Sequence, residues 1–318
     1  MSIAALQRFR RLPAVSAALA AALLLAGCAA PLPERIDVVH GQGLLWQIDK
    51  QGYEPSYLYG TIHISDTKVR QLAPPVEEAF RRARFAAFEL TEDEEGRDGP
   101  IFPPSAVLLP AGQSLQELLD AETYARLIDI AGSREPSRVR LGKLHISRFK
   151  PWFVMMTVAG KPTEGAGNPN PLAPSLDHWL EERARETGKA VTGLETLDEQ
   201  LDVFNGMPLE DQAALLKDRL DDYDNSYSYY TTRQLYLDGD TAMSYSIWQR
   251  TLGRLEPGLA ARYAERFLNR RNVIMVERMQ PLLRDGSTFV SVGALHLPGE
   301  EGVLALLERE GYTVTRLY

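Results

Sequence analysis

The segments SYLYGTIHIS (Ser56–Ser65) and TFVSVGALHLPG (Thr288–Gly299) decide the fold, because each is an apolar run that contains Gly-x-x-His. Short apolar runs bounded by turn residues are typical of buried strands. Glycine lets the backbone turn or approach a neighbour closely just before each histidine. The two segments lie more than two hundred residues apart. They predict two core strands that each deliver a histidine at the strand end.

Further strands and helices surround this pair. The helical stretch Ala73–Arg84 opens with two prolines followed by acidic residues, which is a good helix start. Strands that alternate with helices imply a largely parallel or mixed sheet, so the predicted fold class is α/β (α+β) with a mostly parallel central sheet. A large helical insertion, over about 105–180 and 197–285, is expected to cover this sheet within a single domain, residues 43–318. The other predicted strands are Gly43–Lys50 (in a hairpin with the first segment), Phe85–Leu90, Lys189–Thr196 and Tyr312–Tyr318.

The first residues resemble a secretory signal. Three arginines precede an uninterrupted run of small or apolar residues, Ala14–Ala26, which is short for a membrane span. The run leads into Leu25-Ala26-Gly27-Cys28, which resembles a bacterial lipobox and contains the only cysteine of the chain. We therefore expect residues 1–27 to be a lipoprotein signal peptide, Cys28 to carry a lipid, and residues 28–42 to be a tether. Ala29 after the cysteine favours the outer membrane, with the domain facing the periplasm or the cell surface.

The charge of the chain excludes one class of partner. The formal net charge is −8, and loss of the first 27 residues with their three arginines would make it −11. Such a balance argues against nucleic acid as a partner and against a basic membrane-binding patch. The expected contact with the membrane is the lipid on Cys28.

Four ionisable residues stand where predicted strands stop. Sites in α/β sheets gather at the carboxyl ends of the strands, so neighbouring parallel strands would direct all four side chains into one crevice. A carboxylate within the apolar stretch AAFEL is costly unless it is paired, which favours a functional position for Glu89. The four residues are His63 after strand 56–62, Glu89 at the end of 85–89, Glu195 after 190–194, and His296 after 288–293.

Two chemistries suit this set. Two imidazoles and a carboxylate, here His63, His296 and Glu89, can hold a divalent metal with a position left for water, and the ligand types permit zinc, manganese or cobalt. Alternatively, one histidine acts as a general base on water while a glutamate orients it, with no metal. The long predicted helix 259–283 also carries Arg271 and Asn272, which could bind an anionic group at the site.

These motifs resemble the TraB/GumN family. The resemblance rests on LWQIDKQGYEPSYLYGTIHISD, FEL, KPW, GLETLDEQ, RRN and FVSVGALHLPGEEGVLALLEREGYTV, in this order, and covers residues 43 to 318. The family includes the Tiki proteins, membrane-anchored metalloproteases, and its fold is similar to that of erythromycin esterases and ChaN haem-binding lipoproteins. The resemblance implies functional roles for His63, Glu89 and His296. Glu195 and the Arg271-Asn272 pair match further family motifs.

Two functions follow as hypotheses. The first is a lipid-anchored hydrolase facing the periplasm, a metal-dependent peptidase acting on a peptide or small-molecule substrate. The alternative is a non-catalytic lipoprotein that binds haem, iron or another ligand, with one histidine as an axial ligand. One position departs from the family pattern, because Ser175-Leu176-Asp177 stands where a glycine often begins the motif. We expected Asp177 to make structural contacts near the crevice.

Overall fold

A computed structural model of the protein describes residues 31–64, 66–91, 102–132, 146–157, 175–225, 227 and 229–318. The predicted signal peptide and Cys28 therefore lie outside the described residues, as does most of the stretch 160–175. None of the helices in the described part of the chain combines the length and the apolar character that crossing a bilayer requires.

Six strands form one sheet in the order β4-β3-β5-β2-β1-β6. The four neighbours β4, β3, β5 and β2 run parallel, whereas β1 pairs antiparallel with both β2 and β6. The prediction of a mixed, mostly parallel sheet built from both ends of the chain is confirmed. The strands are β1 (Leu45–Asp49), β2 (Ser56–Thr61), β3 (Phe85–Phe88), β4 (Ala190–Gly193), β5 (Thr288–Gly293) and β6 (Thr313–Arg316).

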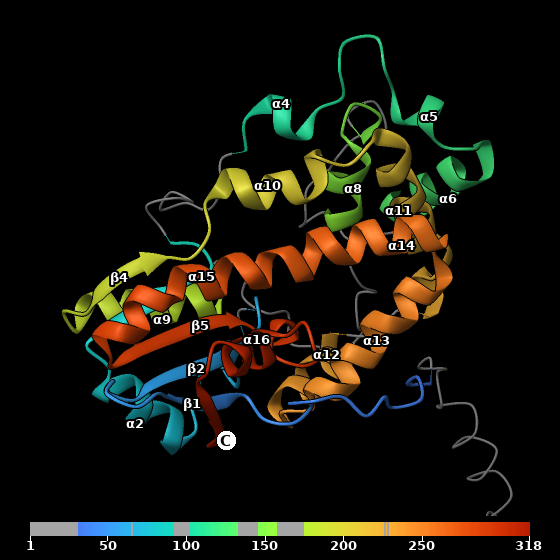
Figure 1. The fold of residues 1–318 in the computed structure, drawn as a ribbon. Coiled ribbons are helices and arrows are strands. Elements are labelled where there is room, and N and C mark those ends of the chain that lie inside the picture. Colours follow the sequence, from blue (N-terminus) through green and yellow to red (C-terminus); the bar gives the residue numbers. More distant parts are fainter. Residues whose placement is uncertain are drawn as a thin grey trace, which may run out of the picture.

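Helices cover both faces of the sheet and continue beyond it (Figure 1). In the described residues the helices of the first half are α2 (Pro74–Arg82), α4 (Pro104–Val107), α5 (Leu115–Leu118), α6 (Ala121–Gly132), α8 (Pro151–Thr157) and α9 (Leu176–Glu186). Those of the second half are α10 (Leu197–Asn205), α11 (Leu209–Asp221), α12 (Tyr229–Leu237), α13 (Thr241–Arg254), α14 (Pro257–Ala264), α15 (Arg270–Asp285) and α16 (Val303–Arg309). Short turns of other types are η1 (Tyr223–Asn225), η2 (Glu265–Asn269) and η3 (Ala294–His296).

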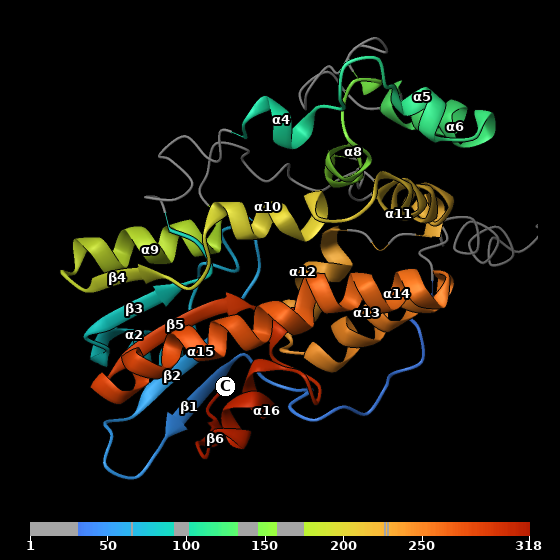
Figure 2. The same cartoon turned by 45° about the horizontal axis from the view of Figure 1, so that its top comes forward.

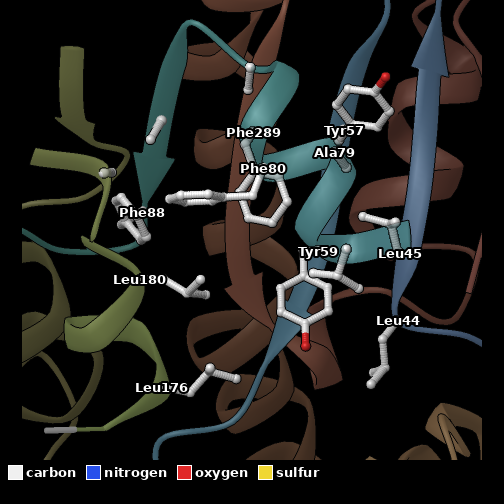
Figure 3. Close-up of a cluster of buried hydrophobic side chains, with 14 of the residues drawn as sticks. Leu44, Leu45, Tyr57, Tyr59, Ala79, Phe80, Phe88, Leu176, Leu180 and Phe289 are labelled. Atoms are coloured by element: carbon white, nitrogen blue, oxygen red, sulfur yellow. The ribbon is translucent and has the colours of Figure 1, made fainter. Parts of the chain in front are cut away.

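One face of the sheet packs against α2 and α9. The α2 residues Val76, Ala79 and Phe80 recur at helical spacing and contact strand residues in a buried cluster, as Figure 3 shows for Ala79 and Phe80. The rings of Phe80 and Phe289 meet nearly at right angles, with their centroids 5.2 Å apart. Leu180 of α9 completes this layer, so the alternate residues of β2, β3 and β5 that face it are fixed in one register.

The opposite face packs against α15 and α16. Met275 and Met279 of α15 and Leu307 of α16 contact the alternate strand residues, including Leu58 and Val290. The buried runs of the parallel strands read as nearly continuous hydrophobic sequence because helices cover both of their faces. The sheet is therefore the middle layer of three.

The remaining helices form a second body beyond the carboxyl ends of the parallel strands (Figure 2). Their side chains make two further hydrophobic clusters, one around Trp152, Phe204 and Trp248 and one around Leu127 and Leu216. The Lys150-Pro151-Trp152 motif belongs to this body, where the Lys150 ammonium donates to Asn205. The helical body thus stands at the edge of the sheet where the strand-end residues emerge.

The glycine of the first Gly-x-x-His motif allows β2 to approach the turn that carries the second. A β-carbon at Gly60 would lie 2.7 Å from Leu297 Cδ1 and 3.1 Å from the Ala294 Cα. Real contacts of this kind are longer, so a larger residue at Gly60 forces the turn to move. The two motifs are thereby packed against each other.

We expect Gly60→Ala to lower the free energy of unfolding by about 1–3 kcal/mol, because the added carbon overpacks the contact with the η3 turn. Urea denaturation followed by circular dichroism measures this loss. The matched control is Gly253→Ala in α13, where an added carbon meets nothing within 4 Å. This control should leave stability unchanged or raise it by up to about 1 kcal/mol. An equal loss in both variants would contradict the close approach.

Candidate active site

The four strand-end residues meet at one edge of the sheet. The register places Thr61 beside Gly293 and Phe88 beside both Ser291 and Gly193, so the four parallel strands end nearly level. The structure therefore brings together the four side chains that the sequence analysis singled out: His63, Glu89, Glu195 and His296.

Glu89 is the centre of this group. Its side chain is only 7% exposed, and Oε1 accepts a hydrogen bond of 2.6 Å from the Gly293 backbone N–H. His296 Nε2 lies 3.5 Å from Oε1, and His63 Nε2 lies 3.7 Å from Oε2. Arg271 Nη2 donates to Oε2 over 3.2 Å. One buried carboxylate thus contacts four groups that come from β5, from both histidine motifs and from α15.

His296 is held in one orientation by Asn272. The Asn272 amide nitrogen donates to the Glu301 carbonyl over 2.7 Å, which turns the Asn272 Oδ1 atom toward the ring. His296 Nδ1 lies 2.5 Å from that oxygen. Because Oδ1 can only accept, Nδ1 carries the proton and Nε2 keeps its lone pair directed at Glu89. Asn272 is therefore a positioning residue and does not face the cavity to bind an anionic group.

His63 is held by Asp177, a residue that the sequence analysis placed near the crevice without naming its partner. His63 Nδ1 lies 2.9 Å from Asp177 Oδ2, and the Thr61 hydroxyl donates to the other oxygen of that carboxylate. Asp177 stands in the first turn of α9, so its position depends on how α9 docks beside the end of β2. The His63 side chain is 64% exposed and faces the cavity, whereas His296 is buried. In metal sites the imidazole nitrogen that does not bind the metal is commonly hydrogen-bonded to a carboxylate. Of the two histidines here, only His63 has such a carboxylate.

Arg271 joins two buried carboxylates. Its guanidinium donates to Glu195 through Nε (2.8 Å) and Nη2 (2.6 Å), in addition to its bond to Glu89. Gln200 donates to Glu195 as well. Arg271 is a candidate from the sequence for binding an anionic group of a ligand, but in this structure its charge is matched by Glu89 and Glu195. Its side chain still reaches the cavity wall.

A π-helical turn aims the Arg271-Asn272 pair. The sequence pattern predicted one continuous helix over 259–283, but α14 is followed by the π turn η2 (Glu265–Asn269) before α15 begins. A π turn inserts one residue and rotates the helix beyond it, and such turns are frequent at functional sites. Here the turn also places Phe267 and Leu268 on the cavity wall. The periodicity of the sequence carries no signal for this insertion.

The surroundings shift the pKa values of His63, Glu89 and His296 in different directions. The Asp177 carboxylate raises the pKa of His63 well above its usual value. Burial and the nearby Arg271 cation lower the pKa of His296 to about 3. Burial alone would raise the pKa of Glu89, but the cationic His63 and Arg271 side chains hold it well below its usual value. At neutral pH the centre therefore contains an ionised Glu89, a neutral His296 and a protonated His63.

The centre lines a cavity of about 340 Å³. It contributes His63, Glu89, Arg271 and His296 to the lining. The other walls come from the end of β2, the π turn, α12 and α13, and they include Tyr227 and Tyr236 from the tyrosine-rich part of the chain. A concave, largely apolar space with a few convergent polar groups is the usual form of a small-ligand or substrate site.

The donors fit a divalent metal in chemical type. A β-carbon at Gly293 would lie 3.3 Å from Glu89 Oε1, 3.6 Å from His296 Cδ2 and 4.0 Å from His63 Nε2, so glycine leaves a small hollow between them. Tetrahedral coordination at about 2.1 Å separates ligand atoms by roughly 3.4 Å, close to the two imidazole–carboxylate distances. The imidazoles approach different oxygens of Glu89, however, and the described residues contain no group of three or more His, Cys, Asp or Glu side chains arranged as a metal centre.

A sequence model of the TraB/PrgY/gumN family matches residues 44–316, and the chain belongs to this family. Metalloprotease TIKI1 of Danio rerio is 27% identical to it, over 85% of this chain and 62% of that protein. Metalloprotease TIKI1 of Homo sapiens is 26% identical, over 85% and 61%. The Metalloprotease TIKI homolog of Nematostella vectensis is 22% identical, over 85% and 66%.

The chain spans about three-fifths of the length of these relatives. No solved structure matches it. The family assignment confirms the resemblance drawn from the motifs between residues 43 and 318.

We expect Glu195→Gln to destabilise the fold by about 3 kcal/mol, because it leaves the buried Arg271 cation with a single carboxylate. The variant Glu78→Gln is the matched control, since Glu78 pairs with Arg81 and Arg82 on the exposed side of α2. Exposed pairs contribute little, so this control should change stability far less. Thermal and urea unfolding of both variants measure the change in the free energy of unfolding. Comparable losses in the two variants would contradict the stabilising role of Glu195 beside Arg271.

Proposed function

We propose that the chain is a hydrolase, a metal-dependent peptidase with His63, Glu89 and His296 at its centre. One observation carries the proposal: both histidines turn Nε2 toward the same buried carboxylate, which lines a cavity. Relatives named metalloproteases support peptide-bond hydrolysis as the reaction. The donor types permit zinc, manganese or cobalt and favour none of them.

Each residue of the centre has a distinct part. A divalent ion held by His63, Glu89 and His296 would polarise the scissile carbonyl and supply a water of lowered pKa. His296 is ready to donate a lone pair, because it is neutral and Asn272 fixes its tautomer. His63 first has to release the proton that Asp177 favours, so metal and protons compete at this residue. Arg271 keeps Glu89 ionised and in place.

We expect the chain, purified without chelators, to hold about one equivalent of divalent metal by elemental analysis and to cleave members of a mixed peptide library. The variants His63→Ala and His296→Ala should each lose the metal. Glu89→Gln should stay folded, because Arg271 still pairs with Glu195, and should cleave peptides at least a hundredfold more slowly. Mass spectrometry of the digested library measures this rate.

His40→Asn is the matched histidine control. His40 pairs with Glu308 away from the cavity, and its positive φ of 55° is one that asparagine tolerates. This variant should keep both metal and activity. Metal retained in both His63→Ala and His296→Ala would overturn the proposal. A Soret band on haem titration, lost in a histidine variant, would favour the haem-binding alternative.

We also propose that Cys28 carries a lipid that anchors the chain to the outer membrane, with the domain facing the periplasm or the cell surface. The support is the sequence Leu25-Ala26-Gly27-Cys28 after an apolar run. Pro31, three residues later, already contacts the helical body, because the Tyr227 hydroxyl donates to its carbonyl. The tether between anchor and domain would then be short.

Replacement of the anchor residue tests this second proposal. In a bacterial host that processes lipoproteins, Cys28→Ala should move the protein from the membrane fraction to the soluble fraction after cell lysis. Mass spectrometry of the unaltered protein should find an acylated N-terminal peptide that begins at Cys28. An unmodified cysteine in mature protein would contradict lipid anchoring.

A further inference from the structure

We infer that the α12–α13 wall of the cavity is a specificity pocket that takes one large apolar side chain of the peptide, next to the scissile bond. This inference rests on the proposed peptidase function and adds the substrate class. It comes from the side chains that line the cavity. His63, Glu89 and Arg271 line it from the strand ends and from α15, whereas Leu235 and Ile247 line it from α12 and α13, among polar residues of the same helices.

Two apolar side chains on this wall lack the packing that such residues usually have. Leu235 of α12 and Ile247 of α13 are each only half-buried and line the cavity. Neither belongs to any of the four hydrophobic clusters formed by the described residues. Leu268 and Leu44 line the same cavity, from the π turn and from the position just before β1. An apolar ligand group placed here would remove this exposed apolar surface from water.

The polar groups along the wall are already satisfied within the protein. The Tyr236 hydroxyl donates to the Gly60 carbonyl and is hydrogen-bonded to the Tyr59 hydroxyl, and Thr241 donates to the His40 carbonyl. Asp240 caps α13 through the Met243 N–H and pairs with Arg35 over 2.6 Å. A polar or charged ligand side chain on this wall would lose its hydration without gaining these partners. The wall thus discriminates against polar side chains as well as favouring apolar ones.

The continuity of the cavity sets the position of the pocket. His63, Glu89 and His296 line the same cavity of about 340 Å³ as Leu235 and Ile247. A peptide whose backbone amide lies beside His63, Glu89 and His296 can therefore extend only a neighbouring side chain along the α12–α13 wall. The volume suits one large side chain such as leucine or phenylalanine, together with part of the peptide backbone.

A series of fluorescein-labelled heptapeptides, with one variable residue flanked by glycines, tests the inference by fluorescence polarisation. Binding is measured to the Glu89→Gln variant as purified, because the loss of this proposed metal ligand prevents turnover. We expect leucine and phenylalanine peptides to bind about tenfold to a hundredfold more tightly than the alanine peptide. Aspartate and lysine peptides should bind more weakly than alanine. Equal binding across the series, or no binding at all, would overturn the inference.

Tryptophan substitutions that fill the pocket test whether the preference for leucine over alanine arises there. Ile247→Trp and Leu235→Trp, on two different helices, should each reduce the leucine-to-alanine ratio to near one, and circular dichroism shows that each variant is folded. Val273→Trp is the matched control, because Val273 is 42% exposed on α15 beside the Arg271-Asn272 pair and does not line the cavity. It should leave the ratio unchanged. An unchanged ratio in both folded pocket variants would overturn the inference.

Cleavage by the unaltered chain separates this inference from the proposed function. Cleavage rates that follow the binding order support both. Ordered binding without cleavage of any peptide contradicts the peptidase function and leaves the apolar pocket standing. Cleavage that is indifferent to the variable residue overturns the pocket and leaves the peptidase.

Discussion

The buried carboxylate of Glu89 is the constraint on which the rest of the site depends. An ionised group with 7% exposure is stable only if charges and donors surround it, and here the Gly293 backbone N–H, the Arg271 cation and the protonated His63 do so. The backbone of Gly293 fixes one oxygen, Arg271 fixes the other, and the two imidazoles approach from either side. The two Gly-x-x-His motifs therefore each place a histidine beside this carboxylate. Each glycine provides the close approach that brings its histidine there.

Much of the architecture could be predicted from the sequence, because strand ends are local features. Apolar runs gave the six strands, and the carboxyl-end rule for α/β sheets placed His63, Glu89, Glu195 and His296 together. The contact of Asp177 with His63 could not be predicted in this way, since it depends on how α9 docks against β2. Nor could the pairing of Arg271 with two carboxylates, which requires the π turn before α15.

The same centre assigns separate tasks to similar groups. The two histidines differ in exposure and in protonation because one lies beside a carboxylate at the cavity mouth and the other is buried beside an amide. Arg271 stabilises the ionised Glu89 that both histidines face. Its charge is therefore not free for a ligand. α12 and α13 contribute Leu235 and Ile247 to the same cavity, together with polar residues, and the helices thereby supply the part of its lining that the sheet lacks.

Anomalous diffraction from crystals grown with manganese, cobalt or zinc tests the central claim most directly. The account predicts a single strong peak within about 2.0–2.3 Å of His63 Nε2, His296 Nε2 and a Glu89 oxygen. A crystal grown at saturating metal concentration would contradict the account if its metal were bound elsewhere and Glu89 were hydrogen-bonded only to Arg271 and the Gly293 backbone.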